Sequence, residues 1–353
     1  MGSNHSTVSD IITMMKMHDN VPYVKGDNDK YTPAIGNKMI TDLQTSHASK
    51  SVLVHSIWCM MYLVKWSEVS TWEKHIVKGL KMKELLWAAF LHDIAKGTHC
   101  GLSCRHGACV TDAYSDMAYN GAGDHTHSLV GAMIVAGETC IFQRCPNHDF
   151  KKKFEAASDK RALYKSVYRN SKKITLAESF FSSHGLSQSR LATAVFMHWD
   201  LGTVHAGLEA KVHAGLEAKE EKVPRHMTPL GYLTKFVNAC IRFGSEPKTS
   251  LLRLCLAVSF ADNAGSDQPC DDLIICNDLC QKITAVDSSF RGLCGGSIRL
   301  LNYYRPPNFW KQRNWHTHGI TTMRAILVSW KENRSSLLNH YVQFRKNDEQ
   351  CFE

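Results

Sequence analysis

The sequence predicts an all-α fold, and three observations lead to that prediction. Apolar residues recur at helical spacing in several runs, including 52–63, 85–97 and 251–262. With 353 residues, 44% of them hydrophobic, the chain can bury a sizeable core around such helices. No apolar run reaches the roughly 20 residues that a membrane-spanning helix requires, so no transmembrane segment is expected.

Residues 1–46 are predicted to form an N-terminal arm around the core. The segment is polar and punctuated by proline and glycine, with one short helix expected at 11–17. Its first six residues fit the N-myristoylation pattern, so Gly2 is either an acylation site or a chance match.

Two core helices are predicted within 47–96, and the second, 85–97, carries the most informative residues of the chain. The positions three, four and seven before His92 are all apolar, which places His92 on the buried face of its helix. Gly97 is expected to end that helix, so His92 and Asp93 lie at its last turn. Burying an imidazole beside a carboxylate is unfavourable unless a partner pairs with them, and a divalent metal is the strongest such partner.

The same feature recurs in four further apolar helical runs, each with a metal-capable residue at an inward position. These residues are His55, His127, His198 and Asp262. Neutral imidazoles and carboxylates suit Mn, Fe, Ni, Co or Zn better than a hydrated Mg ion. One ion would be held by His55, His92, Asp93 and Asp262, and a second ion by His127 and His198. The alternative for each residue taken alone is an ordinary buried polar side chain.

The order His, His-Asp, His, His, Asp along a helical chain resembles the HD-domain superfamily of metal-dependent phosphohydrolases. The resemblance covers roughly residues 47–290. It is carried by His55, His92-Asp93 followed by Ile94-Ala95-Lys96, His127 in His-Ser-Leu-Val-Gly-Ala, His198, and Asp262 in Phe-Ala-Asp-Asn. Trp199 follows His198 where many binuclear members carry a second histidine. The fold implied is an HD-domain-like helical bundle with long loop insertions.

The resemblance also implies an activity: a phosphohydrolase or phosphodiesterase that uses one or two divalent transition metal ions. Asp93 would bridge the two ions, and a metal-bound hydroxide would attack the phosphorus of a nucleotide or nucleic acid. Catalytic roles fall to Asp93, Lys96 and Asp262, with Lys96 also binding substrate phosphate or else favouring the helix C-terminus. Two alternatives stay open: a di-iron HD-type oxygenase with the same ligands, and a non-catalytic HD module that binds nucleic acid.

Three segments are predicted to be loop insertions, at about 97–123, 137–175 and 202–225. The first contains four soft ligands within ten residues, which suit a structural zinc ion or remain free thiols. They are Cys100, Cys104, His106 and Cys109. The second insertion is strongly basic over 144–175, as either a solvated helical segment or a track for a polyanion. The third holds an identical tandem repeat, VHAGLEAK, at 204–219, interpreted as a duplication in an exposed, partly helical loop.

Residues 291–353 are predicted to form a C-terminal helical accessory segment that ends in an amphipathic helix at 321–344. The net charge of +9 favours anionic partners such as nucleotides, nucleic acid or a membrane surface. Thirteen cysteines without a secretory signal indicate reduced thiols or metal ligands, and hence an intracellular, cytoplasmic protein. The sequence leaves the oligomeric state open.

Overall fold

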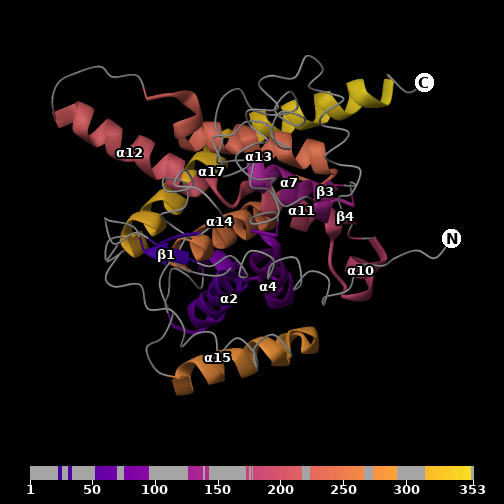
Figure 1. The fold of residues 1–353 in the computed structure, drawn as a ribbon. Helices are drawn as coiled ribbons and strands as arrows, with labels where there is room; N and C mark the ends of the chain where they lie inside the picture. The colour runs from indigo at the N-terminus through magenta and orange to yellow at the C-terminus, as the bar shows by residue number, and fades with distance from the viewer. Residues whose placement is uncertain are drawn as a thin grey trace, which may run out of the picture.

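The described part of the chain is predominantly helical, as the sequence predicts (Figure 1). The computed structural model describes residues 23–25, 31–33, 52–69, 75–94, 126–137, 140–142, 172–174, 176, 178–216, 223–265, 273–291 and 315–350. Its α-helices are α2 (Val52–Val69), α4 (Met82–Leu91), α7 (Thr126–Val135), α10 (Glu178–Ser183), α11 (Gln188–Met197), α12 (Asp200–Leu216), α13 (Pro229–Phe243), α14 (Thr249–Ala264), α15 (Leu273–Val286) and α17 (Trp315–Gln350). Two 3₁₀ turns, η3 (Arg225–Met227) and η4 (Ser288–Phe290), connect some of them.

Two small antiparallel ribbons accompany the helices, which the prediction of an all-α fold did not include. One pairs β1 (Tyr23–Lys25) with β2 (Tyr31–Pro33). The other pairs β3 (Cys140–Phe142) with β4 (Lys172–Ile174), so that Cys140 lies opposite Ile174. The second ribbon therefore brings together the two ends of the insertion predicted at 137–175.

Helix α11 lies at the centre of the packing and contacts α4, α7, α13 and α14. Its residues from Leu191 to Met197 are all buried, and so are nearly all residues of α14 from Leu251 to Asp262. A helix surrounded by other helices has to be apolar on most of its surface, which explains why apolar residues predominate in these two buried stretches. Gly131 of α7 permits a close approach to α11, because an added Cβ would lie 3.2 Å from Val195 Cγ1.

Local signals set the boundaries of α13. Thr228 caps its N-terminus by accepting a hydrogen bond from the Gly231 N–H at 3.0 Å, and Pro229 occupies the first helical position. Gly244 ends the helix with a φ of 68°, a left-handed conformation that glycine adopts without steric penalty.

Helix α17 closes the bundle against α13, α14 and α12. Trp330 Nε1 donates a hydrogen bond to Thr249 Oγ1 over 3.0 Å, and the Trp330 ring centroid lies 5.8 Å from that of Phe236. The helix runs from Trp315 to Gln350 and is longer than the predicted 321–344. The prediction relied on apolar periodicity, which ends before the helix does because its last turns are polar.

Two boundaries predicted from the sequence are wrong. Helix α4 ends at Leu91 rather than at Gly97. Here His92 Nδ1 bonds to the Ala89 carbonyl at 2.6 Å, an oxygen that a continuing helix would offer to the N–H of Asp93. The other is the start of the insertion predicted at 202–225 as an exposed, partly helical loop: the helix α12 runs through its first residues to Leu216, and Val204 is buried.

The cysteine prediction needs one correction as well. Cys59, Cys240, Cys255 and Cys280 are buried and not disulfide-bonded, but Cys276 forms a disulfide bond, so the described cysteines are not uniformly reduced. None of the helices in the described ranges is long and apolar enough to cross a membrane.

Asp287 ties the end of α15 to α4. Trp87 Nε1 donates to Asp287 Oδ2 over 2.9 Å, and Lys83 Nζ lies 3.1 Å from the same oxygen. The Ser289 N–H donates to Oδ1 over 3.0 Å, which opens η4 and places the Phe290 ring 4.7 Å from that of Trp87. Burial disfavours the charged form of Asp287, but the hydrogen bonds from Trp87, Ser289 and Lys83 outweigh it and lower its pKa to about 2.

Asp287→Asn should lower the free energy of unfolding at pH 7 by about 1–3 kcal/mol, because charge-assisted contacts to Trp87 and Lys83 are lost. The charge stabilises the fold above its ordinary pKa of 3.8, and its contribution disappears as the pH falls towards the folded-state pKa of about 2. The difference between the two proteins should therefore shrink over that range, as measured by urea unfolding at several pH values.

The matched control is Asp278→Asn. Asp278 also pairs with a lysine, Lys282, but its side chain is 55% exposed. Its loss should change the free energy of unfolding by no more than about 0.5 kcal/mol. Equal losses in the two variants, or a loss at Asp287 that does not vary with pH, would contradict the assignment.

Candidate metal centre

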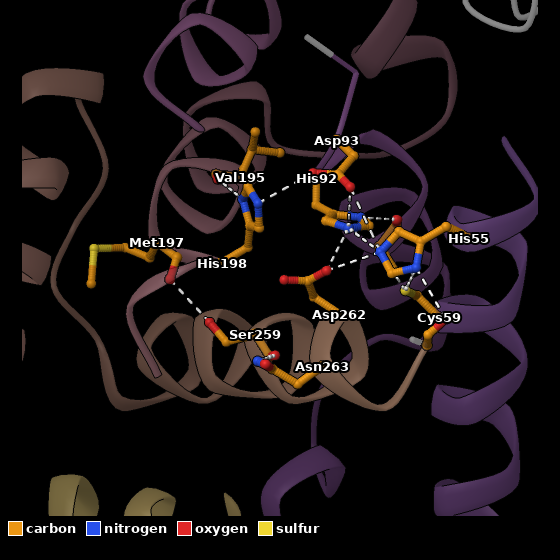
Figure 2. A network of polar contacts seen from close by, with 12 residues as sticks. His55, Cys59, His92, Asp93, Val195, Met197, His198, Ser259, Asp262 and Asn263 are labelled. Carbon is orange, nitrogen blue, oxygen red and sulfur yellow. Dashed lines mark hydrogen bonds and ion pairs between the residues drawn. The ribbon is translucent and has the colours of Figure 1, made fainter. Parts of the chain in front are cut away.

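Four of the six predicted metal ligands meet in one buried cluster. His55 comes from α2, His92 and Asp93 from the end of α4, and Asp262 from the last turn of α14 (Figure 2). Each is at most 3% exposed. One donor atom from each lies within 4.8 Å of one donor atom from every other, so the four make a single group that could hold a metal ion.

The distances between donor atoms are those of a coordination polyhedron. His55 Nε2 lies 2.9 Å from Asp262 Oδ1, 3.6 Å from Asp93 Oδ2 and 3.2 Å from His92 Nε2. His92 Nε2 lies 3.4 Å from Asp93 Oδ2 and 3.3 Å from Asp262 Oδ1. Donors about 2.1 Å from a common ion are separated by about 3.0 Å in octahedral and about 3.4 Å in tetrahedral geometry. The observed spacings fall around these values.

Backbone carbonyls orient the imidazoles so that their lone pairs face the cluster. His55 Nδ1 bonds to the Gly265 carbonyl over 3.1 Å, and His92 Nδ1 to the Ala89 carbonyl over 2.6 Å. A carbonyl oxygen only accepts, so each Nδ1 carries the proton, and in a neutral ring Nε2 is then an acceptor. Ligating histidines typically have this arrangement, in which the second nitrogen donates to a carbonyl or carboxylate.

A third histidine is held in the same way. His198 follows α11 directly, is fully buried, and bonds through Nδ1 to the Val195 carbonyl at 2.6 Å. Its Nε2 lies 3.4 Å from Asp93 Oδ1, whereas Asp93 Oδ2 faces His55 and His92. The two oxygens of Asp93 therefore face imidazoles on different sides.

The cluster concentrates acceptors and negative charge where water cannot compensate for them. Burial lowers the pKa of His55. At His92 burial also disfavours the charged ring, but Asp93 and Asp262 outweigh this and raise its pKa to about 10. One proton on His92 offsets only one of two carboxylate charges. A divalent cation would offset both.

Hydrogen bonds between helices hold the cluster in register. Ser259 Oγ donates to the Met197 carbonyl over 3.0 Å, which joins α14 to the end of α11 directly before His198 (Figure 2). The Ser259 hydroxyl therefore fixes the spacing between two segments that carry predicted ligands, Asp262 in α14 and His198 directly after α11.

The remaining predicted site residues lie outside what the structure describes. His127 falls in the first turn of α7, and its side chain is not described. Lys96 follows the described turn at 92–94. The possible zinc ligands also lie outside the described residues: Cys100, Cys104, His106 and Cys109.

Sequence reasoning missed two groups beside the cluster. Cys59 lies one turn after His55, and its Sγ is 3.6 Å from His55 Nε2. The sequence placed it on the helical face of His55, but its apolar neighbours favoured a role in the core. The Gly265 carbonyl, which orients His55, gave no signal because a backbone acceptor is independent of residue type.

No family model, curated protein or solved structure matches the chain.

His92→Ala and Asp262→Asn should each abolish high-affinity binding of a divalent transition metal. The first removes a donor nitrogen, and the second replaces a charged carboxylate with a neutral amide. His184→Ala is the matched control. His184 also bonds through Nδ1 to a carbonyl, that of Phe180 at 2.7 Å, but its Nε2 bonds to Ser289 Oγ instead of facing a carboxylate. Metal content after loading and desalting, measured by elemental analysis, would distinguish the variants.

Thermal unfolding gives an independent readout of the same binding. Metal at 100 times its dissociation constant should stabilise the wild type by about 2.7 kcal/mol and should leave the two cluster variants unchanged. Stabilisation of all the variants alike would locate the metal elsewhere.

Proposed function

We propose that the chain is a metal-dependent phosphohydrolase that cleaves a phosphate ester of a nucleotide or a nucleic acid. The observation that carries the proposal is the convergence of imidazole Nε2 atoms on the carboxylates of Asp93 and Asp262. In the neutral form of each ring, Nε2 directs a lone pair inward, because the Nδ1 of the same ring donates to a carbonyl. Such a set of donors is unfavourable in a buried site without a cation.

The placement of Asp93 favours a centre that takes up to two ions. Its Oδ2 lies 3.6 Å from His55 Nε2, and its Oδ1 lies 3.4 Å from His198 Nε2. A carboxylate that presents one oxygen to each side is suited to bridge two cations. His55, His92 and Asp262 would complete the first ion, and His198, with His127 as its predicted partner, the second.

The family resemblance and the charge of the chain favour phosphate esters as substrates. The order His, His-Asp, His, His, Asp resembles HD-domain phosphohydrolases, and these residues include the four that cluster. When bound, the ions would supply Lewis acidity and lower the pKa of a water molecule that attacks phosphorus. The protein's net charge of +9 would favour the approach of a polyanion.

The chain's own residues would have distinct tasks. Asp93 and Asp262 hold negative charge at fixed positions, and the backbone carbonyls keep the imidazoles in the tautomer that binds. Lys96, three residues after Asp93, would bind the substrate phosphate and stabilise the charge that develops on it. These assignments follow the resemblance and are open to separate tests.

The test combines metal content with phosphate release from a panel of nucleotides and oligonucleotides, for wild type and Asp93→Asn. Loss of both metal and hydrolysis in Asp93→Asn, with about two metal equivalents in the wild type, is the expected result. A single equivalent would remove His127 and His198 from the ligand set. Hydrolysis that persists in Asp93→Asn would overturn the proposal.

Lys96→Met separates substrate binding from metal binding. The loss of a charged hydrogen bond of about 1.5–3 kcal/mol should lower kcat/KM by about 10–150-fold and leave the metal content unchanged. Lys96→Arg should recover part of the activity because it restores the positive charge. An unchanged kcat/KM in Lys96→Met would assign the lysine to the helix terminus instead.

The same experiments distinguish the two alternative functions. A di-iron oxygenase requires dioxygen, so phosphate release under nitrogen would exclude it as the explanation. A non-catalytic nucleic-acid-binding module would show salt-dependent affinity that is indifferent to Asp93→Asn, with no phosphate released.

A further inference from the structure

Cys59 brings a sulfur atom to the histidine pair of the cluster. It lies on α2 four residues after His55, is completely buried, and is not disulfide-bonded. Its Sγ is 3.6 Å from His55 Nε2 and 4.0 Å from His55 Nδ1 (Figure 2). One donor atom each from His55, Cys59 and His92 lie within 4.8 Å of one another, so these three residues form a second group that could hold a metal ion.

The sulfur–nitrogen distance fits a shared ion. With a metal–sulfur distance of about 2.3 Å and a metal–nitrogen distance of about 2.1 Å, tetrahedral geometry separates the two donors by about 3.6 Å. The distance from Cys59 Sγ to His55 Nε2 is 3.6 Å. Because Sγ also lies 4.0 Å from His55 Nδ1, the sulfur is beside the ring, and a bond to an ion on the Nε2 lone pair requires the Cys59 side chain to turn towards that ion.

Gly265 allows the sulfur to occupy this place. A Cβ on residue 265 would overlap Cys59 Sγ. The φ of Gly265 is −65°, an ordinary helical value, so its backbone conformation does not require glycine. Glycine is required here because any side chain at position 265 would fill the space that the Cys59 sulfur occupies. Because the carbonyl of the same residue accepts from His55 Nδ1, one backbone position both orients the imidazole and makes room for the thiol.

The two groups share His55 and His92 but differ in chemical softness. One adds two carboxylates, and the other adds the Cys59 sulfur, which does not belong to the group with Asp93 and Asp262. Carboxylate oxygens favour hard ions such as Mn²⁺, whereas thiolates favour softer ions such as Zn²⁺ and Cd²⁺. The position of an ion between the two groups then depends on which ion it is.

We propose that Cys59 is a thiolate ligand to soft divalent ions bound at His55 and His92, and that it sets the metal selectivity of the centre. The proposal rests on the metal centre of the proposed function but not on hydrolysis. Binding replaces the S–H bond with a sulfur–metal bond and releases the proton to solvent, with no change of oxidation state. Hard ions bind on the carboxylate side and leave the thiol protonated.

The test compares Cd²⁺ and Mn²⁺ binding in wild type, Cys59→Ala and Cys59→Ser. One equivalent of Cd²⁺ should give the wild type an ultraviolet thiolate-to-cadmium charge-transfer band that both variants lack. Cd²⁺ affinity should fall by at least about tenfold in the variants, whereas Mn²⁺ affinity should stay within about threefold. Retained Mn²⁺ binding also shows that the variants are folded.

Two controls account for the other thiols of the chain. Cys255→Ala removes a buried free thiol on α14 that is outside both groups and should leave the band intact. His92→Ala should abolish the band, because it removes the imidazole that both groups share. Any charge-transfer absorption that survives His92→Ala belongs to other cysteines and is subtracted.

The outcomes separate this proposal from the metal centre itself. Cd²⁺ that binds in a His92-dependent way, with the same spectrum in wild type and Cys59→Ala, would overturn the role of Cys59 and leave the centre standing. An absence of His92-dependent binding of both Cd²⁺ and Mn²⁺ would overturn both.

Discussion

The structure depends on one electrostatic constraint, the burial of the Asp93 and Asp262 carboxylates among imidazoles that turn their Nε2 atoms towards them. Water cannot screen these groups, because His55, His92, Asp93 and Asp262 are at most 3% exposed. Each imidazole donates its Nδ1–H to a backbone carbonyl. Its Nε2 can therefore donate to a carboxylate only when the ring is positively charged. A cation shared by His55, His92, Asp93 and Asp262 would resolve this conflict, and the surrounding helices fix where that cation would lie.

Two of the predicted ligands, His92 and His198, are oriented by the same kind of hydrogen bond at the end of a helix. His92 and His198 each follow a ten-residue buried helix, and each bonds through Nδ1 to the carbonyl three residues earlier at 2.6 Å. At a helix C-terminus the last carbonyls lack intrahelical partners, so the side chain satisfies one of them. The same bond turns the opposite edge of the ring toward the cluster. The end of the helix thus becomes a rigid support for a ligand, better fixed than a loop would be.

Sequence reasoning predicted the parts of the site that local pattern determines. The apolar residues three and four positions before His92 and His198 correctly placed both rings inside, and the helical periodicity of 251–262 did the same for Asp262. Their convergence came from the family resemblance, because spacing within one helix carries no information about another. The end of α4 at Leu91 was missed for a related reason. It accompanies a side-chain bond that the apolar pattern does not encode.

Cys59 shows most clearly where sequence pattern stops being informative. A buried cysteine beside apolar residues is usually a small core residue, and nothing in α2 distinguishes it from one. The position of its sulfur beside His55 depends on Gly265, 206 positions later in the chain. Gly265 has no side chain and so leaves the volume that the sulfur fills. The same glycine carbonyl turns His55 toward the carboxylates. A substitution at position 265 would therefore disturb sulfur and imidazole together, so the soft and hard donor groups are coupled through the backbone of α14 as well as through a shared ion.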